Sequence, residues 1–486
     1  MRLLLSKVLI FAGTILVASC TGDPPAAPPE IIIPDSSQPI LYSKHVAPIF
    51  ARSCGSSGCH MNGDDGGGLK LDTWEPVLEG STSYGAEVIP HWPERSMLFQ
   101  HINIDTLLGP VALPHMPLSR TALPRDQVLT IRRWIGEGAR NDAGDVALGE
   151  ASRPRVFVTN QSEDVVAVID LATERVARYI AVGERSGGSP EAPHNITLSQ
   201  DGAYAYVNLI AGGSIEKYDA RTFARLGSTA VGSSPAQITI TPDGSRLFVS
   251  NFDVTLRQRW IVVVDASSMA VIDTIADVGD APHGVVLSPD GRIVITTNAL
   301  GDDLSVIDVG TLEVVERIPA SPDNPIAPGT SPQLEPYQGE FTRDGRYFWF
   351  TCRAGAQVRI LDVGARRVVD SIGVATRPLI PSFTPDGREF WAPGQANGQI
   401  SIIDVETRRV TATISGLATQ PHAVAFTSDG RAAFVSCENQ KGEGHHPTSG
   451  ASVIPGRVYV IDVPTRSIRR VIEVGGFAAG IAVGRP

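Results

Sequence analysis

One repeated pattern decides the fold of this chain, and its clearest copy is Asp243-Gly244-Ser245-Arg246-Leu247-Phe248-Val249-Ser250-Asn251. Asp-Gly is a strong signal for a tight turn between antiparallel strands. The residues from Arg246 to Asn251 include several that favour extended structure. The stretch therefore predicts a turn followed by a β-strand.

The Asp-Gly turn occurs six times, and consecutive copies are 42, 47, 54, 42 and 43 residues apart. The six copies begin at Asp201, Asp243, Asp290, Asp344, Asp386 and Asp429. A second mark, a strand that ends in aspartate, occurs at Asp170, Asp219, Asp265, Asp308, Asp362, Asp404 and Asp462. Four strands in a period of about 40–45 residues are typical of the blades of a β-propeller.

The two ends of the repeat region predict how the ring closes. Residues 155–182 supply three strands and lack an innermost one, whereas residues 478–483 form an innermost-type strand with no partner after it. We expect the last strand to complete the first blade, which gives a seven-bladed propeller over residues 153–486. Phrases such as Val156-Phe157-Val158-Thr159-Asn160 resemble the YVTN-type propeller family. That resemblance implies the fold and leaves the function open, because propellers host many chemistries.

The first 39 residues predict export and a lipid anchor. Arg2 and Lys7 precede a short apolar core, and Val17-Ala18-Ser19-Cys20 resembles a lipobox. We expect a signal peptide over residues 1–19, a lipid on Cys20, and a proline-rich tether over residues 20–39. The alternative is an ordinary secretory signal with a chance cysteine. The prediction places the protein in the cell envelope of a Gram-negative bacterium, on the periplasmic or outer-surface side of a membrane.

Composition narrows the classes of partner. The net charge is −11, and no cluster of basic residues stands out, so we expect no nucleic acid as a partner. The 48 glycines and 36 prolines are typical of a chain with many turns.

A second stretch, Cys54-Gly55-Ser56-Ser57-Gly58-Cys59-His60, places two cysteines directly before a histidine. This order suits covalent haem, since each thiol can bond a vinyl group while the imidazole ligates the iron. The usual spacing is C-x-x-C-H, and the gap here is two residues longer. The motif predicts haem c on Cys54 and Cys59, with His60 as one axial ligand.

Met116 is the candidate for the other axial ligand, because a thioether suits haem iron. It lies 56 residues after His60 (116 − 60), which is enough chain to reach the opposite haem face. Residues 40–145 also predict several helices, and the last of these carries an apolar stripe of Val128, Ile131, Trp134 and Ile135.

This region resembles the class I c-type cytochromes that precede other domains in bacterial secreted proteins. The resemblance rests on the haem attachment residues, on Met116-Pro117, and on the closing helix that ends Trp134-Ile135-Gly136-Glu137-Gly138-Ala139. It implies a small all-α domain over residues 40–145 with one haem c.

Other interpretations of the same residues stay open. Cys54 and Cys59 could form a short disulfide or, with few other ligands nearby, a zinc site. Met116 could be a core residue, with His91, His101 or His115 as the sixth ligand. Met61 and Met97 are expected to be packing residues.

The predicted propeller keeps its histidines on one face. Three innermost strands begin Pro-His, at His194, His283 and His422, and this position lies at the mouth of the central channel. The imidazoles could bind a copper or other metal ion, with Cys437, His445 or His446 as further ligands. Alternatively, each imidazole hydrogen-bonds a neighbouring blade. Cys352 and Cys437 are expected to be core residues, too far apart for a disulfide. Four insertions, within residues 184–193, 252–259, 319–336 and 438–456, fall on this face and mark it as a contact surface.

Three functional hypotheses follow. In the first, the protein transfers electrons between its haem and a site or redox partner protein on the propeller face, either alone or as part of an oxidoreductase. A cytochrome c domain with a propeller resembles the two-haem nitrite reductases, and the propeller alone resembles the heavy subunit of methylamine dehydrogenase. Nitrite reductase propellers have eight blades, and we count seven here. In the second hypothesis the propeller is a binding scaffold without catalysis, and in the third the chain is a structural surface lipoprotein without haem.

Overall fold

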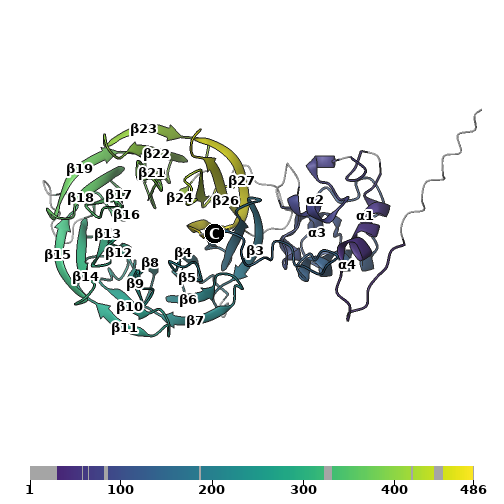
Figure 1. Ribbon diagram of the computed structural model, residues 1–486, viewed down its shortest axis with the longest axis horizontal. Helices are drawn as coiled ribbons and strands as arrows, with labels where there is room; N and C mark the ends of the chain where they lie inside the picture. Colours follow the sequence, from purple (N-terminus) through teal and green to yellow (C-terminus); the bar gives the residue numbers. More distant parts are fainter. Residues whose placement is uncertain are drawn as a thin grey trace, which may run out of the picture.

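The computed structural model describes residues 30–56, 58–63, 65–80, 86–184, 188–321, 331–417, 420–442 and 453–484. Seven four-stranded antiparallel sheets form a closed ring, so the prediction of a seven-bladed propeller is confirmed (Figure 1). We number the blades one to seven along the chain.

The strands are given from the innermost to the outermost of each blade. Blades one to four are β28 (Ala478–Val483), β1 (Arg155–Asn160), β2 (Val165–Asp170), β3 (Arg175–Ala181); β4 (Pro193–Leu198), β5 (Tyr204–Leu209), β6 (Ser214–Asp219), β7 (Arg225–Ala230); β8 (Pro235–Ile240), β9 (Arg246–Asn251), β10 (Ile261–Asp265), β11 (Val271–Ile275); β12 (Pro282–Leu287), β13 (Ile293–Asn298), β14 (Asp303–Asp308), β15 (Glu313–Pro319). Blades five to seven are β16 (Pro336–Phe341), β17 (Tyr347–Cys352), β18 (Gln357–Asp362), β19 (Arg367–Gly373); β20 (Ser382–Phe383), β21 (Glu389–Gly394), β22 (Gln399–Asp404), β23 (Arg409–Ile414); β24 (Pro421–Phe426), β25 (Ala432–Cys437), β26 (Pro455–Asp462), β27 (Ser467–Gly476).

The ring closes through the last strand of the chain. β28 pairs antiparallel with β1, with Phe157 opposite Ala482 and Val158 opposite Ile481. Blade one is therefore built from both ends of the repeat region, as the sequence predicted. Because a closed ring leaves no unpaired inner strand, this pairing holds the propeller shut.

Both sequence marks of the repeat are turns capped by a carboxylate. Asp243 accepts hydrogen bonds from the Thr241 hydroxyl (2.5 Å) and the Ser245 amide (3.0 Å), and these bonds lower its pKa to about 2. Gly244 has a φ of 71°, a conformation that glycine adopts without strain. Asp265, at the end of β10, accepts bonds from the amides of Ser267 and Ser268. The repeated aspartates therefore fix the turns at both ends of the blade strands.

The blades pack face to face through apolar side chains. Tyr206 and Ile215 of blade two share one buried cluster with Leu247 and Val249 of blade three. Cys352 and Cys437 are buried in two separate clusters of this kind and are free thiols, as expected.

The region before the propeller differs in part from the prediction. Its described residues form four α-helices, α1 (Ala47–Ser53), α2 (Trp74–Glu79), α3 (Met97–Ile102) and α4 (Arg125–Gly136), and the short π- and 3-10 segments η1 (Tyr42–Val46), η2 (Gly66–Gly68) and η3 (Pro93–Arg95). Long loops join the helices, so a distinct all-α domain is not evident. The region nevertheless has its own hydrophobic cluster, in which Phe50, Phe99 and Trp134 are fully buried.

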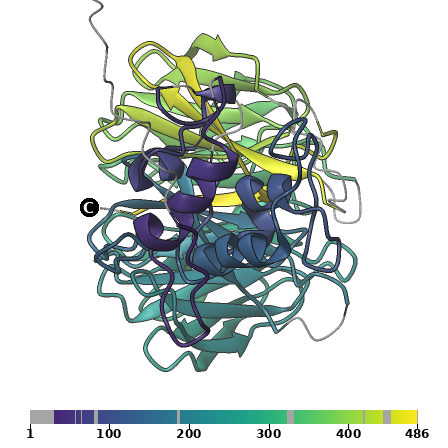
Figure 2. The same cartoon turned by 90° about the vertical axis from the view of Figure 1, so that its right-hand side faces the viewer.

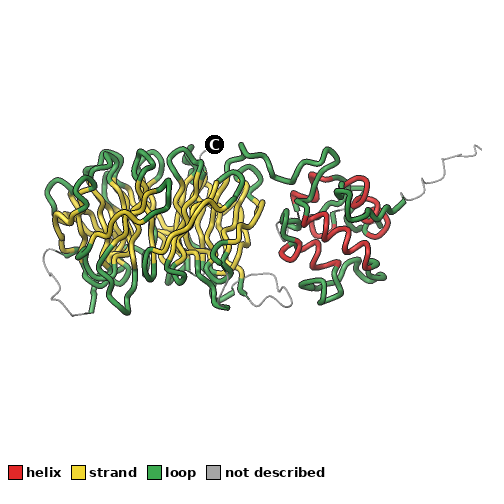
Figure 3. The backbone as a smooth tube through the Cα atoms, turned by 90° about the horizontal axis from the view of Figure 1, so that it is seen from below, coloured by secondary structure: helices red, strands yellow, loops and turns green. Residues whose placement is uncertain are grey.

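This helical region lies beside blade one, at the edge of the ring (Figures 1 and 2). In the side view the helices and the strand layer form two adjacent bodies (Figure 3). Ile89 joins the buried cluster of blades one and seven, and the Trp92 ring meets the Tyr179 ring edge-on at 5.4 Å. Arg95 pairs with Glu163 and lies over the rings of Trp92 and Tyr179.

No helix among the described residues is long and apolar enough to cross a membrane. The predicted signal peptide and lipid-bearing Cys20 lie outside the described residues, as do His445 and His446.

Candidate functional site

The first candidate site is the loop that follows α1. Cys54 ends this helix, with its amide donating to the Phe50 carbonyl at 2.7 Å. The chain then folds back, so that the His60 amide donates to the Cys54 carbonyl at 3.3 Å. A side chain at Gly66 would place its Cβ 2.7 Å from the Cys59 carbonyl oxygen and 3.3 Å from the Cε1 atom of His60. The glycine-rich segment is therefore needed for the chain to pass close over His60.

The His60 ring is oriented by the backbone. Its Nδ1 lies 3.2 Å from the Leu69 carbonyl oxygen, a partner that requires a proton on Nδ1. The Leu71 amide donates to the His60 carbonyl at 2.7 Å and fixes the same segment. With Nδ1 engaged in this way, Nε2 is the ring atom that can ligate a metal.

Cys54 and Cys59 are free thiols, so the short disulfide considered above is not formed. Cys54 is buried, and burial, together with the nearby Cys59, raises the pKa of its thiol to about 12. The Cys54 thiol is therefore protonated at neutral pH, and a reaction partner or a metal ion would have to displace its proton.

Met116 is half-buried and packs against the hydrophobic cluster that contains Cys54 and Met61. Its amide donates to the His101 carbonyl at 2.8 Å, which fixes the loop that carries it. Large apolar side chains are exposed around this loop, among them Leu113 and Leu118. Met61 is buried in the cluster, in keeping with its expected packing role.

Of the three histidines named as alternatives to Met116, His101 and His115 lie at the loop that carries Met116, and His91 lies beside α4. The Nδ1 of His91 lies 3.2 Å from the Gly136 carbonyl oxygen, beside the end of α4. His101 places its Nδ1 2.8 Å from the Pro114 carbonyl oxygen, and His115 is exposed.

The second candidate site is at the mouth of the propeller channel. His194, His283 and His422 follow the first residues of β4, β12 and β24, in blades two, four and seven. They are far apart in the chain, yet the His194 ring centroid lies 5.6 Å from that of His283 and 5.3 Å from that of His422. All three side chains are buried. The ring architecture therefore brings them together, as the sequence predicted for this position.

Each of these imidazoles has a partner at Nδ1. His283 Nδ1 lies 2.9 Å from the Tyr337 carbonyl oxygen, and His422 Nδ1 lies 2.8 Å from Glu438 Oε1. His194 Nδ1 lies 2.7 Å from the side-chain nitrogen of Gln161, which donates to it. Tyr337 lies in the blade next to that of His283, and Gln161 lies in the blade next to that of His194. The expected bonds between blades are therefore found at two of the three histidines.

Two of the three Nε2 atoms face each other. The Nε2 atoms of His194 and His283 are 3.4 Å apart. His422 Nε2 is buried and has no hydrogen-bond partner among the described residues. Within the described part of the chain, no group of three His, Cys, Asp or Glu side chains already meets the geometry of a metal site.

Burial sets the charge state of the cluster. Desolvation, with a smaller contribution from His422, lowers the pKa of His194 to about 3, and burial also holds the pKa of His283 well below its usual value. Aromatic rings enclose the cluster, since Tyr337 stacks on His283 at 3.6 Å and Phe252 meets it edge-on at 4.9 Å. Both imidazoles are therefore neutral at pH 7.

Sequence reasoning missed the groups that hold the imidazoles. Gln161 and Glu438 each follow directly on the second strand of a blade, and so does Arg353, which pairs with Glu335 at 3.0 Å. The residue after the second strand occupies an equivalent place in every blade. The sequence repeat could therefore have identified these residues as a second set of side chains around the channel mouth.

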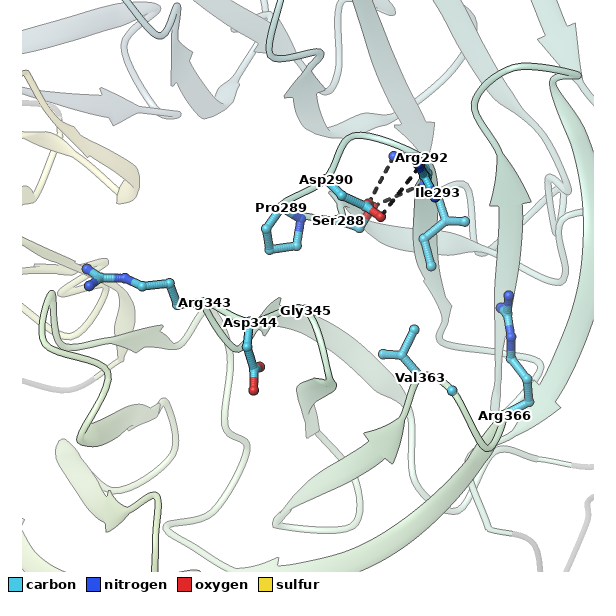
Figure 4. A pocket seen from close by; sticks show the side chains of 11 residues that line it. Ser288, Pro289, Asp290, Arg292, Ile293, Arg343, Asp344, Gly345, Val363 and Arg366 are labelled. Carbon is cyan, nitrogen blue, oxygen red and sulfur yellow. Dashed lines mark hydrogen bonds and ion pairs between the residues drawn. The ribbon is translucent and has the colours of Figure 1, made fainter.

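A cleft of about 590 Å³ lies on the opposite face, where the Asp-Gly turns of blades four and five meet. Figure 4 shows Asp290, Arg292, Asp344 and Arg366 around it. The Asp290 carboxylate accepts from the Ser288 hydroxyl at 2.6 Å, and the Asp344 carboxylate accepts from the Thr342 hydroxyl at 2.6 Å. These carboxylates are bonded within their own turns, as in the other blades. The cleft is therefore explained by the repeated turn structure.

Comparison with known proteins supports the fold. No family model matches the chain, and neither does any curated protein. Hydrazine synthase from Kuenenia stuttgartiensis is similar over 56% of this chain and 76% of its own, at 24% identity and a TM-score of 0.44. A functionally unknown protein from Desulfotomaculum acetoxidans is similar over 68% of this chain and 99% of its own, at 12% identity and a TM-score of 0.53. The second likeness supports the propeller architecture alone.

Proposed function

We propose that this protein is a haem c electron-transfer protein of the cell envelope. The observation that carries the proposal is the loop from Cys54 to His60, which holds two free thiols directly before an imidazole whose Nδ1 is bonded to the Leu69 carbonyl. A haem-ligating histidine needs that arrangement, because the bond at Nδ1 fixes the tautomer and leaves Nε2 for iron.

The residues around the loop fit a haem group. Cys54 and Cys59 would hold the porphyrin covalently, and His60 and Met116 would be the axial ligands. Haem bound in this way supplies one reversible electron, at a potential that a thioether ligand raises. The protein's own part is to orient the His60 ring through Leu69, to exclude water with the cluster around Phe99 and Trp134, and to hold Met116 through His101.

The proposal also includes the location of the protein and its partners. A lipid on Cys20 would anchor it to a membrane, and a redox partner protein would exchange electrons with the haem. The exposed apolar side chains beside Met116, including Leu113 and Leu118, would offer a partner protein an apolar contact. The propeller, which resembles the YVTN type, would supply a docking face or a redox site.

An absorption spectrum tests the proposal. The full chain is expressed with a cytochrome c maturation system, and spectra are recorded before and after reduction with dithionite. We expect sharp α and β bands on reduction, and haem that stays on the chain after denaturation. The variant Cys54→Ser/Cys59→Ser is expected to lose covalent haem, whereas Cys352→Ser keeps it.

A protein that folds without covalent haem would overturn the proposal. The propeller would then be considered as a binding scaffold, the alternative function named above.

A further inference from the structure

The histidine cluster at the channel mouth has no part in the proposed haem function. Three buried imidazoles from three blades meet at one end of the channel, and their partners at Nδ1 are already in place. We propose that His194, His283 and His422 bind a late first-row divalent metal ion, zinc(II) or copper(II), through their Nε2 atoms.

The first argument is the spacing of the donor atoms. Two imidazoles bound to one tetrahedral ion, each at 2.0–2.1 Å, have nitrogen atoms about 3.3–3.4 Å apart. The Nε2 atoms of His194 and His283 are 3.4 Å apart. Two of the ligands therefore already have the separation that a shared ion requires.

The second argument is the unpartnered donor of His422. This imidazole is 3% exposed, and its Nε2 has no hydrogen-bond partner among the described residues. A buried polar atom without a partner costs free energy, which a bound ion would recover. The three donors do not enclose a common point in the structure, so binding of a shared ion requires the imidazole rings to reorient.

The third argument is the outer layer of hydrogen bonds. Histidines that ligate a metal donate their other ring nitrogen to a carboxylate, a carbonyl or a similar acceptor. His422 meets the Glu438 carboxylate and His283 meets the Tyr337 carbonyl in this way. The atom that faces His194 Nδ1 is the Gln161 side-chain nitrogen, a donor, so this amide has to turn its oxygen towards Nδ1 before His194 can bind the ion through Nε2. Glu438 is itself held by Gln395 and Gln440, each at 2.7 Å.

The chemistry of the donors identifies the class of ion. Three imidazole donors, with no carboxylate or thiolate among the proposed ligands, favour zinc and copper over calcium or magnesium, which prefer oxygen ligands. Three protein ligands leave one tetrahedral position for water or a small molecule from the channel. The site would therefore be open rather than purely structural.

Zinc binding to the full-length, haem-loaded protein tests the proposal. After treatment with a chelator, zinc(II) is added, and its stoichiometry and affinity are measured by elemental analysis and calorimetry. Iron is counted separately, so that failure of this proposal and failure of the haem proposal are distinguishable. We expect one zinc per chain and, by zinc X-ray absorption, nitrogen or oxygen neighbours at about 2.0 Å with no sulfur at about 2.3 Å.

Variants separate this site from its alternatives. We expect His422→Ala to weaken zinc binding at least about 100-fold, and Glu438→Gln about 10-fold, because the latter alters only the outer partner of His422. The control is His445→Ala/His446→Ala, in the segment outside the described residues, which keeps full affinity. Thermal unfolding of each variant shows whether it is folded.

Three results would each overturn the proposal. These are no stoichiometric zinc, zinc that is lost in the His445/His446 variant but kept in His422→Ala, and a sulfur neighbour that points to Cys437. If His422→Ala does not fold, Glu438→Gln decides, since unchanged affinity in that variant contradicts the proposed outer layer.

Discussion

Glu340, on the innermost strand of blade five, shows how burial in the fold changes the ionisation of a single side chain. Desolvation raises the pKa of its carboxyl group to about 7, against the lowering effect of a 2.9 Å hydrogen bond from the Phe383 amide. The folded protein therefore keeps this proton up to about pH 7, whereas an unfolded chain releases it near pH 4.5. The corresponding stability is present below pH 4.5 and is lost as the pH rises to about 7.

Glu340→Gln should remove this pH dependence, because the amide does not ionise. From pH 5 to pH 8, we expect the variant to gain up to about 3 kcal/mol of unfolding free energy relative to the wild type, and less where channel water screens the charge. Urea unfolding at both pH values measures it. Glu406→Gln, at an exposed turn, controls for the loss of one carboxyl group. Equal pH dependence in Glu340→Gln and the wild type would contradict the prediction.

Met116 permits a test of the proposed haem ligation at the same scale. Because a thioether raises the potential of haem iron relative to imidazole, Met116→His should lower the midpoint potential by at least about 0.1 V while haem is retained. A spectroscopic redox titration measures the shift. Met97→Leu, at the start of α3, should leave the potential unchanged. An unchanged potential in Met116→His would direct attention to His91, His101 or His115 as the ligand.

At the scale of the element, the closing strand β28 depends on a glycine. A Cβ at Gly480 would lie 2.7 Å from both the Asn195 Cα and the His194 carbonyl oxygen of the neighbouring innermost strand. Those are backbone atoms, which cannot turn aside as a flexible side chain can. Glycine at this position allows β28 to approach β4 closely, which the narrow centre of the ring requires.

Gly480→Ala is therefore expected to destabilise the propeller by about 2 kcal/mol, through overpacking at the point of closure. The matched control is Gly373→Ala at the end of β19, where a Cβ meets nothing within 4 Å. Chemical denaturation of the two variants measures the difference. Equal unfolding free energies of the two variants would mean that β28 and β4 can move apart at little cost, which would contradict tight closure.

At the scale of the molecule, the contact between the helical region and blade one rests on a few side chains. Arg95 pairs with Glu163, and its guanidinium lies 4.6 Å from the Tyr179 ring centroid and 5.4 Å from that of Trp92. The arginine is largely buried between the two parts, so its charge is screened less than at the surface.

Arg95→Ala should loosen this contact without unfolding either part. We expect faster amide hydrogen exchange over residues 86–96, at least about tenfold, because an ion pair and a cation–π contact are lost together. Arg125→Ala, which removes an exposed pair with Asp105 at 3.4 Å, provides the control. Exchange as slow as in the wild type would show that Ile89 and Trp92 hold the two parts together unaided.

The sequence by itself determined the architecture of the propeller. The Asp-Gly turns and the strand-ending aspartates carry their own hydrogen-bond partners within a few residues, as Asp243 and Asp265 show. Because these hydrogen bonds are local, the residues that make them recur as a visible sequence pattern. Both the number of blades and the closing role of residues 478–483 could therefore be predicted. The sequence also named the candidate haem and histidine residues.

Only the tertiary structure decided which groups act on those residues. Gln161 could not be recognised as a partner of His194, because that contact depends on how blades one and two meet at the channel. Glu438 reaches His422 only through the register in which β24 pairs with β25. The contact between Trp92 and Tyr179 is likewise a product of two bodies packing together. The separations between imidazoles of blades two, four and seven depend on the radius of the closed ring, which is a property of all seven blades at once.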